Sequence, residues 1–290
     1  MRRTGAPGTE KPTVRPEPAD GIVVDVTELR HGFVTRSGDV IEAVRDVSLV
    51  VKRGEFVCIV GPSGCGKTTL IRIIAGLESG LVSGSVQIND AGQGTPAGKR
   101  LPVTLVFQQD STLPWLRVLD NVMLGMSGLH LPKREMKERA AHYLDMVGLS
   151  EFMNAYPHEL SGGMRQRVAI ARALAPEPAL LLMDEPLAAL DAQTRLLMQG
   201  ELLELVARTG TAVMYITHDV EEAVTLGDRV VVMTQRPGRI KTDQPTPWSE
   251  LGDKGSMDIL KYRADPSVAL FVEELSISLR AEVGGRLRIL

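Results

Sequence analysis

Short apolar runs recur along the chain and predict a sheet. Two stretches near the start, residues 22–29 and 41–51, resemble strands with one exposed face, because apolar and polar positions alternate there. Residues 179–183 form a continuous apolar run, which is typical of a strand buried on both faces of a parallel sheet. Further strands are predicted at residues 56–60, 85–88, 103–107, 211–216, 229–234 and 239–241.

A helical pattern interrupts the strands in the middle of the chain. It extends from residue 118 to about 175, and apolar positions recur at helical spacing between 133 and 147. Because strand patterns precede and follow it, we expect a helical insert within a sheet-based domain. Further helices are predicted at residues 70–76, 190–207, 256–262 and 268–279.

Composition narrows the class of protein. The chain has 290 residues, of which 43% are hydrophobic and 24% charged, as in an ordinary globular protein. Its net charge of -3 and pI of about 6.0 argue against a nucleic-acid binder. No apolar run is long enough to span a bilayer, and the start lacks the apolar segment of a secretory signal. Cys58 and Cys65 are expected to be reduced thiols, and residues 1–20 form a proline-containing disordered tail.

A glycine-rich loop follows the strand predicted at residues 56–60. It fits the pattern G-x-x-x-x-G-K-[ST], whose backbone N–H groups and following helix attract phosphate. Lys67 is expected to bridge the outer phosphates, and the Thr68 hydroxyl to ligate Mg2+. A chance glycine turn is the alternative, and the strand and helix on either side argue against it. The predicted nucleotide contacts here are Gly61, Pro62, Ser63, Gly64, Cys65, Gly66, Lys67, Thr68 and Thr69.

A second glycine pair opens another helix. Ser161 occupies the N-cap position, and Gly162 and Gly163 leave the first N–H groups uncovered, so this is a second helix start able to bind an anion. A plain helix cap is the alternative interpretation.

Polar side chains also follow three of the predicted strands. Gln108 comes directly after one strand, Asp184 and Glu185 end the continuous apolar run, and His218 follows the next strand. Two carboxylates at a buried strand end need a cation or hydrogen bonds to offset their desolvation. In proteins with such a phosphate loop, Asp184 is placed to hold Mg2+ and Glu185 to polarise an attacking water.

The order of these motifs resembles the ATP-binding subunits of ABC transporters, over roughly residues 21–242. The resemblance implies an α/β fold, with a P-loop NTPase (RecA-like) core of mainly parallel sheet, an N-terminal antiparallel β subdomain and an inserted α-helical subdomain at about 112–175. Residues 243–290 are then a short C-terminal helical extension, expected to pack back onto the core. The matching motifs are Walker A (61–69), the Q-loop glutamine Gln108, the signature (160–166), the Walker B Asp184, the catalytic Glu185, the D-loop with Asp191, and the switch histidine His218.

The resemblance also assigns roles. Phe33, which the residues alone favour as a core aromatic in a loop between two strands, takes the place of an adenine-stacking aromatic. Two subunits close head to tail on two ATP molecules, so that each ATP meets Ser161, Gly162 and Gly163 of the other subunit. Thr68, Gln108 and Asp184 organise Mg2+, while Glu185 orients or deprotonates water and His218 steadies the γ-phosphate.

The implied partners are a second ATPase subunit, integral membrane permease subunits and, indirectly, a substrate-binding protein, with the chain peripheral at the cytoplasmic face of the membrane. Cys65 within the loop and residues 113–122 narrow the resemblance to importers of nitrate, sulfonates, taurine and related small anions. The alternative is a soluble ATPase of the same superfamily acting on DNA or ribosomes. The insert is too short for the repair type, and the single cassette does not fit the translation-factor type.

Overall fold

The computed structural model describes residues 21–35, 37–78, 81–89, 102–108, 111–248 and 258–284. The predicted tail at residues 1–20 and parts of the predicted extension at 243–290 therefore lie outside the described residues. Across the described residues, no helix is both long and apolar enough to cross a membrane.

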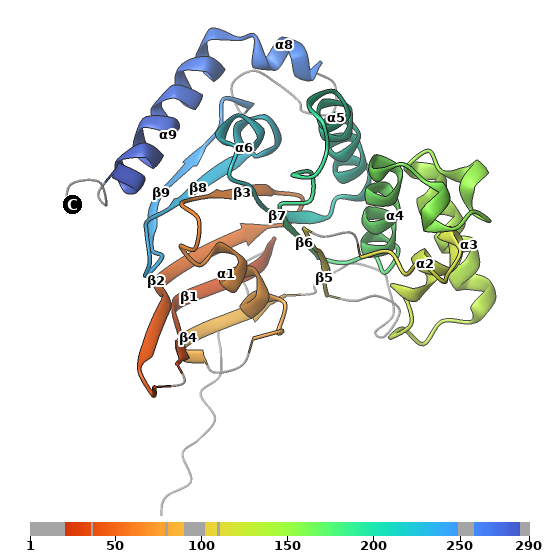
Figure 1. The fold of residues 1–290 in the computed structure, drawn as a ribbon, viewed down its shortest axis with the longest axis horizontal. Helices are drawn as coiled ribbons and strands as arrows, with labels where there is room; N and C mark the ends of the chain where they lie inside the picture. The colour runs from red at the N-terminus through yellow and green to blue at the C-terminus, as the bar shows by residue number, and fades with distance from the viewer. Residues whose placement is uncertain are drawn as a thin grey trace, which may run out of the picture.

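A six-stranded sheet forms the centre of the molecule (Figure 1). The first five strands in its spatial order are parallel, and the last joins as an antiparallel edge strand. The order is β5 (Val103–Val106), β6 (Leu180–Asp184), β7 (Ala212–Ile216), β3 (Phe56–Val60), β8 (Arg229–Met233) and β9 (Ile240–Pro245). The prediction of a mainly parallel sheet is confirmed.

A second, antiparallel sheet has the order β2 (Val40–Lys52), β1 (Ile22–Val34) and β4 (Leu81–Ile88). The prediction that Phe33 lies in a loop was wrong, because β1 continues to Val34 and Phe33 pairs with Ile41. Register shifts between Val26 and Gly32 break the alternation of side chains without ending the strand. The sequence pattern was interrupted there, so the predicted strand stopped too early.

Helices cover the sheets and fill the insert (Figure 1). They are α1 (Lys67–Ile74), α2 (Val118–Leu124), α3 (Lys133–Met146), α4 (Gly162–Leu174), α5 (Ala192–Thr209), α6 (Val220–Leu226), α8 (Ile259–Arg263) and α9 (Pro266–Gly284), with 3-10 turns at Ser150–Phe152 and Pro157–Glu159. Helix α1 begins at Lys67, earlier than predicted, because the chain turns into the helix directly from Gly66. Helix α6 was not predicted; Asp219 caps it by accepting hydrogen bonds from the N–H groups of Glu221 and Glu222.

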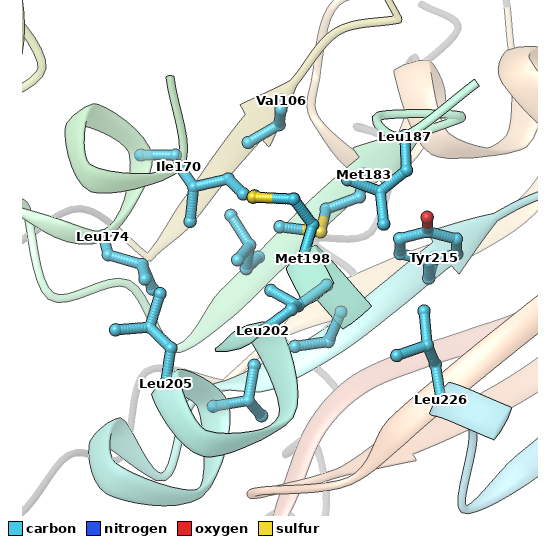
Figure 2. Packing of buried hydrophobic residues seen from close by; sticks show 14 of the residues in the cluster. Val106, Ile170, Leu174, Met183, Leu187, Met198, Leu202, Leu205, Tyr215 and Leu226 are labelled. Carbon is cyan, nitrogen blue, oxygen red and sulfur yellow. The ribbon is translucent and has the colours of Figure 1, made fainter. Parts of the chain in front are cut away.

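The alternation of side chains along the buried strands divides the core into two clusters. Val57 and Ile59 of β3 point into the cluster shared with α1 and the antiparallel sheet. Cys58 and Val60 point to the opposite face, into the cluster shared with α4, α5 and α6. Figure 2 shows this second cluster, where Met183 of β6 and Tyr215 of β7 approach helical residues such as Met198. Cover on both faces explains the uninterrupted apolar runs of the sequence.

The C-terminal helices pack back onto α6, as predicted. The ring of Trp248 stacks on Tyr262 with a centroid distance of 3.5 Å. Its Nε1–H donates to the carbonyl of Thr225 at 2.9 Å, and the Tyr262 hydroxyl donates to the carbonyl of Val224 at 3.2 Å. Burial raises the pKa of the Tyr262 hydroxyl. Figure 1 shows α9 continuing from this point along the side of the molecule where β9 lies.

Candidate functional site

The phosphate loop connects β3 to α1 at the carboxyl edge of the central sheet. Its conformation depends on glycine at the N-cap of α1, where Gly66 has φ of 109°. A Cβ there would lie 2.7 Å from the carbonyl oxygen of Ala43, so a larger residue is excluded by both backbone angle and space. Among the described residues no side chain caps α1, which leaves its first N–H groups for an anion.

Lys67 closes the loop from within. Its ammonium donates to the carbonyl oxygens of Gly61 at 2.7 Å and Pro62 at 3.1 Å. Lys67 is only 7% exposed, and these carbonyls offset the desolvation of its charge. The cation is thus fixed at the base of the loop, where phosphates are expected.

A pocket of about 220 Å³ opens above this loop. Phe33 stands at its wall, 42% exposed, with its ring edge-on to His31 at a centroid distance of 4.9 Å. The pocket therefore combines an accessible aromatic ring with a phosphate loop. Its lining residues are Phe33, Ala43, Ser63, Gly64, Cys65, Gly66, Lys67, Thr68, Thr69, Glu185 and Arg236.

Two of these lining residues, Ala43 and Arg236, were not predicted from the sequence. Arg236 lies in the turn between β8 and β9, far from the loop in sequence, and reaches it only through the pairing of strands. Cys65, by contrast, was predicted, and it is a buried free thiol like Cys58. Burial raises the pKa of the Cys65 thiol, although the Lys67 charge acts in the opposite direction.

Thr68 and Asp184 place two oxygen atoms together beside the loop. The Thr68 hydroxyl donates to the Asp184 carboxylate at 3.2 Å. Burial raises the pKa of Asp184, the bond from Thr68 lowers it, and the neighbouring Glu185 raises it again. Hydroxyl and carboxylate oxygens are the donors that Mg2+ prefers, so these residues fit the predicted ion.

Three strand ends converge on Glu185. Gln108, which follows β5, donates its amide N–H to the Glu185 carboxylate at 3.3 Å, and His218 Nδ1, after β7, lies 3.2 Å from the same oxygen. The Glu185 backbone is held by a bond from its N–H to the carbonyl of Ile216 at 3.0 Å. It has φ of 46°, a left-handed conformation that disfavours a non-glycine residue by about 1–2 kcal/mol. The structure thus brings Gln108 to Glu185, whereas Thr68 bonds to Asp184.

The second glycine pair lies on a separate element. Ser161 caps α4 by accepting the N–H of Met164 at 3.2 Å, and both Ser161 and Gly162 are exposed. In Figure 1, α4 stands apart from α1. None of the described residues that line the pocket above the phosphate loop comes from positions 161–163.

Asp191 also acts as a helix cap. Its carboxylate accepts the N–H groups of Gln193 at 3.1 Å and Thr194 at 3.0 Å, together with the Thr194 hydroxyl at 2.7 Å. These bonds, led by those from Thr194, lower the pKa of Asp191. The start of α5 adjoins that of α4, because a Cβ on Gly163 would lie 3.1 Å from a methyl group of Thr194.

Comparison with known proteins gives consistent matches. The ABC transporter family matches residues 44–188. The taurine import ATP-binding protein TauB of Roseobacter denitrificans is 44% identical over 82% of this chain and 88% of its own length. The nitrate import ATP-binding protein NrtD of Synechocystis is 41% identical over 89% of this chain and 95% of its own.

Solved structures give the same result. A dimeric ATP-binding cassette in a post-hydrolysis state, bound to ADP and Pi, is 33% identical with a TM-score of 0.64, covering 77% of this chain and 98% of that one. The cbiO1 protein of Clostridium perfringens, part of an ABC transporter complex, is 25% identical with a TM-score of 0.67 over 87% of this chain and 99% of its own.

Proposed function

Because this chain belongs to the ABC transporter family and is an ATPase of that type, we propose that it powers a membrane importer of a small anionic solute of the taurine or nitrate kind. The observation that carries the proposal is the convergence of the phosphate loop, the Thr68–Asp184 pair and the Gln108–Glu185–His218 cluster on one edge of the sheet. The import functions for which these relatives are named, taurine and nitrate uptake, support the solute class. They offer nothing for the alternative, a soluble ATPase acting on DNA or ribosomes.

The pocket above the phosphate loop is the proposed ATP site. Phe33 stacks on the base, since its accessible ring forms one wall. Backbone N–H groups between Gly61 and Thr69 donate to the phosphates, and the buried Lys67 ammonium neutralises their charge from below.

Thr68, Asp184 and Gln108 are the residues proposed to hold Mg2+ and its waters. When bound, the ion neutralises charge that develops on the outer phosphates. Thr68 and Asp184 share a hydrogen bond, and Gln108, which donates to Glu185 in this structure, follows the adjacent strand end, so these three side chains would hold the ion and its waters.

Glu185 is the proposed base for the attacking water. Its left-handed backbone and its bond to Ile216 fix where the carboxylate points. His218 contacts the same carboxylate oxygen that Gln108 does, so movement of either residue changes the hydrogen bonding of the base. His218 is proposed to steady the γ-phosphate and Glu185 to accept a proton from water.

A second subunit completes the proposed site. The exposed start of α4 supplies Ser161, Gly162 and Gly163 to the ATP bound by the partner, and Asp191 holds the adjoining start of α5 for the same contact. The dimeric form of the solved relative supports this assembly.

The remaining proposed partners are integral membrane permease subunits and, through them, a substrate-binding protein, which places the chain at the cytoplasmic face of the membrane. Co-expression with its proposed permease subunits should yield a stable complex. In that complex ATP hydrolysis should rise when the binding protein carries its solute, taurine and nitrate being the first two to test. A Lys67→Ala complex is the control without hydrolysis. A chain that never associates with the membrane subunits would contradict the transport proposal.

A further inference from the structure

Arg236 adds a second cation to the proposed ATP site. It lies in the turn between β8 and β9, and its Nε–H donates to the carbonyl oxygen of Gly64 at 3.2 Å. A Cβ on Gly64 would lie 3.7 Å from a terminal nitrogen of the same guanidinium. Arg236 is exposed, whereas Lys67 is nearly buried, so one cation lies at the rim of the pocket and the other at its base.

The turn that carries Arg236 is fixed directly against the phosphate loop. Gly238 donates its N–H to the carbonyl of Ala43 at 2.9 Å and accepts the N–H of Arg45 at 2.9 Å. A Cβ on Gly238 would lie 2.1 Å from the carbonyl oxygen of Cys65, so only glycine permits this approach. The backbone of the turn is therefore held, two residues after Arg236, against both β2 and the phosphate loop.

The C-terminal helix α9 braces the same turn from outside. The Glu282 carboxylate pairs with Lys241 at 2.8 Å and lies 3.4 Å from the N–H of Gln235, the residue that precedes Arg236. The Gln235 side chain donates to the Glu282 carbonyl, and Lys241 also donates to the Ser278 carbonyl at 3.0 Å. Gln235 thus links the last turns of α9 to Arg236 at the rim of the pocket.

We propose that Arg236 is a nucleotide-binding residue whose guanidinium donates to the phosphates of bound ATP, and that Glu282 of α9 is a positioning residue that holds it there through Gln235. This inference rests on the proposed ATP pocket. The planar fork of arginine matches phosphate oxygens, and beyond Gly64 no hydrogen bond joins the Arg236 guanidinium to another described residue. Because the rim cation contacts bound ATP before and during the reaction alike, its loss weakens binding and leaves turnover at saturation intact.

The test is binding of radiolabelled Mg-ATP by equilibrium dialysis, with steady-state hydrolysis, on the full chain. Arg236→Gln should raise Kd and KM about tenfold and change kcat less than about twofold. Arg236→Lys should restore part of the affinity. Arg239→Gln is the matched control: it removes the same charge from the same turn, but Arg239 pairs with Asp46 at 3.1 Å and does not line the pocket.

Equal Kd values for Arg236→Gln and Arg239→Gln would overturn the inference. Failure of the wild-type chain to bind ATP, or unchanged binding in Lys67→Ala, would instead refute the proposed pocket itself, so the two failures are distinguishable.

Glu282 is tested by a double-mutant cycle. Glu282→Gln should raise Kd about threefold in the wild-type background and not at all in the Arg236→Gln background, because its effect passes through Arg236. Glu273→Gln, on the exposed side of the same helix, is the control and should leave Kd unchanged. Additive effects of Glu282→Gln and Arg236→Gln would overturn the positioning role of Glu282.

Discussion

The two glycine-flanked helix starts of this chain, at α1 and at α4, differ in whether a side chain accepts a hydrogen bond from their first N–H groups. At α1 no side chain in the described part of the chain caps the helix, and the nearly buried Lys67 closes the loop beneath it. At α4 the Ser161 hydroxyl accepts the N–H of Met164, and the start faces outward. The first start has a pocket around it within one chain, whereas the second presents Ser161 and Gly162 at the exposed surface. Enclosure, more than glycine content, therefore distinguishes a site that one chain completes from one that needs a second chain.

The largest expected effect comes from replacing Glu185, the proposed base beside the first helix start. Glu185→Gln should lower kcat about 10³-fold while ATP still binds, because the proton acceptor is lost but the loop is intact. ATP should then hold two chains together, giving a dimer in gel filtration. Glu177→Gln is a matched control, since Glu177 is also a glutamate with positive φ. Rapid hydrolysis by Glu185→Gln would contradict the assignment of the base.

Mixing two inactive variants tests the comparison directly. Lys67→Ala disables the first start, and Gly162→Asp places a negative charge at the second, where it repels a partner's phosphate. An acidic residue at a helix N-terminus is favourable, and a Cβ on Gly162 meets only the end of Arg165, so this variant should fold. Each variant alone should be inactive. A one-to-one mixture should recover about a quarter of the wild-type sites, because half the dimers are mixed and each has one intact site.

Absence of recovery, with mixed dimers verified by two affinity tags, would show that the second start does not act across chains. The experiment requires no knowledge of the transported solute.

Much of the first site was predictable, because its parts follow buried strands. Parallel strands place their carboxyl ends at one edge, so Gln108, Glu185 and His218 could be expected together from sequence alone. The position of Phe33 within a strand could not be predicted, because register shifts in β1 interrupt the alternation of apolar and polar residues from which a strand is recognised. The contact of Arg236 with Gly64 was equally hidden, since it depends on how a turn formed late in the chain packs on the loop.

Replacing Phe33 tests whether the site at the first helix start also binds the base of ATP. Phe33→Ala should raise KM for ATP about tenfold, because stacking of a base on an aromatic ring contributes about 1–3 kcal/mol. Phe33→Tyr keeps the ring and should stay within about twofold of the wild type. Steady-state hydrolysis at varied ATP checks both variants. An unchanged KM in Phe33→Ala would leave the ring as a packing partner of His31 alone.

The smallest expected effect is on stability, and it has opposite signs at two aspartates. Burial raises the pKa of Asp184 beside the first start, while hydrogen bonds from Thr194 lower the pKa of Asp191 beside the second. The raised pKa of Asp184 means that stability falls as pH rises through the range between its ordinary and raised pKa, so ionised Asp184 destabilises the nucleotide-free fold at pH 7. The lowered pKa of Asp191 means that its stabilisation is present at pH 7 and is lost as pH falls through its folded-state pKa.

Neutralising each aspartate in turn, and measuring Tm without nucleotide, therefore tests whether the two charges affect stability in opposite directions. Asp184→Asn keeps an acceptor for Thr68 and should raise Tm by about 1–3 °C at pH 7, with the gain shrinking as the pH falls toward the ordinary pKa of aspartate. The same variant should lose the further rise in Tm that Mg-ATP gives the wild-type chain. Asp191→Asn keeps the cap but not the charge, and should leave Tm equal or slightly lower. A lower Tm for Asp184→Asn would mean that the ionised carboxylate stabilises the nucleotide-free protein. That result would contradict the expectation that burial of this carboxylate lowers stability until a cation binds beside it.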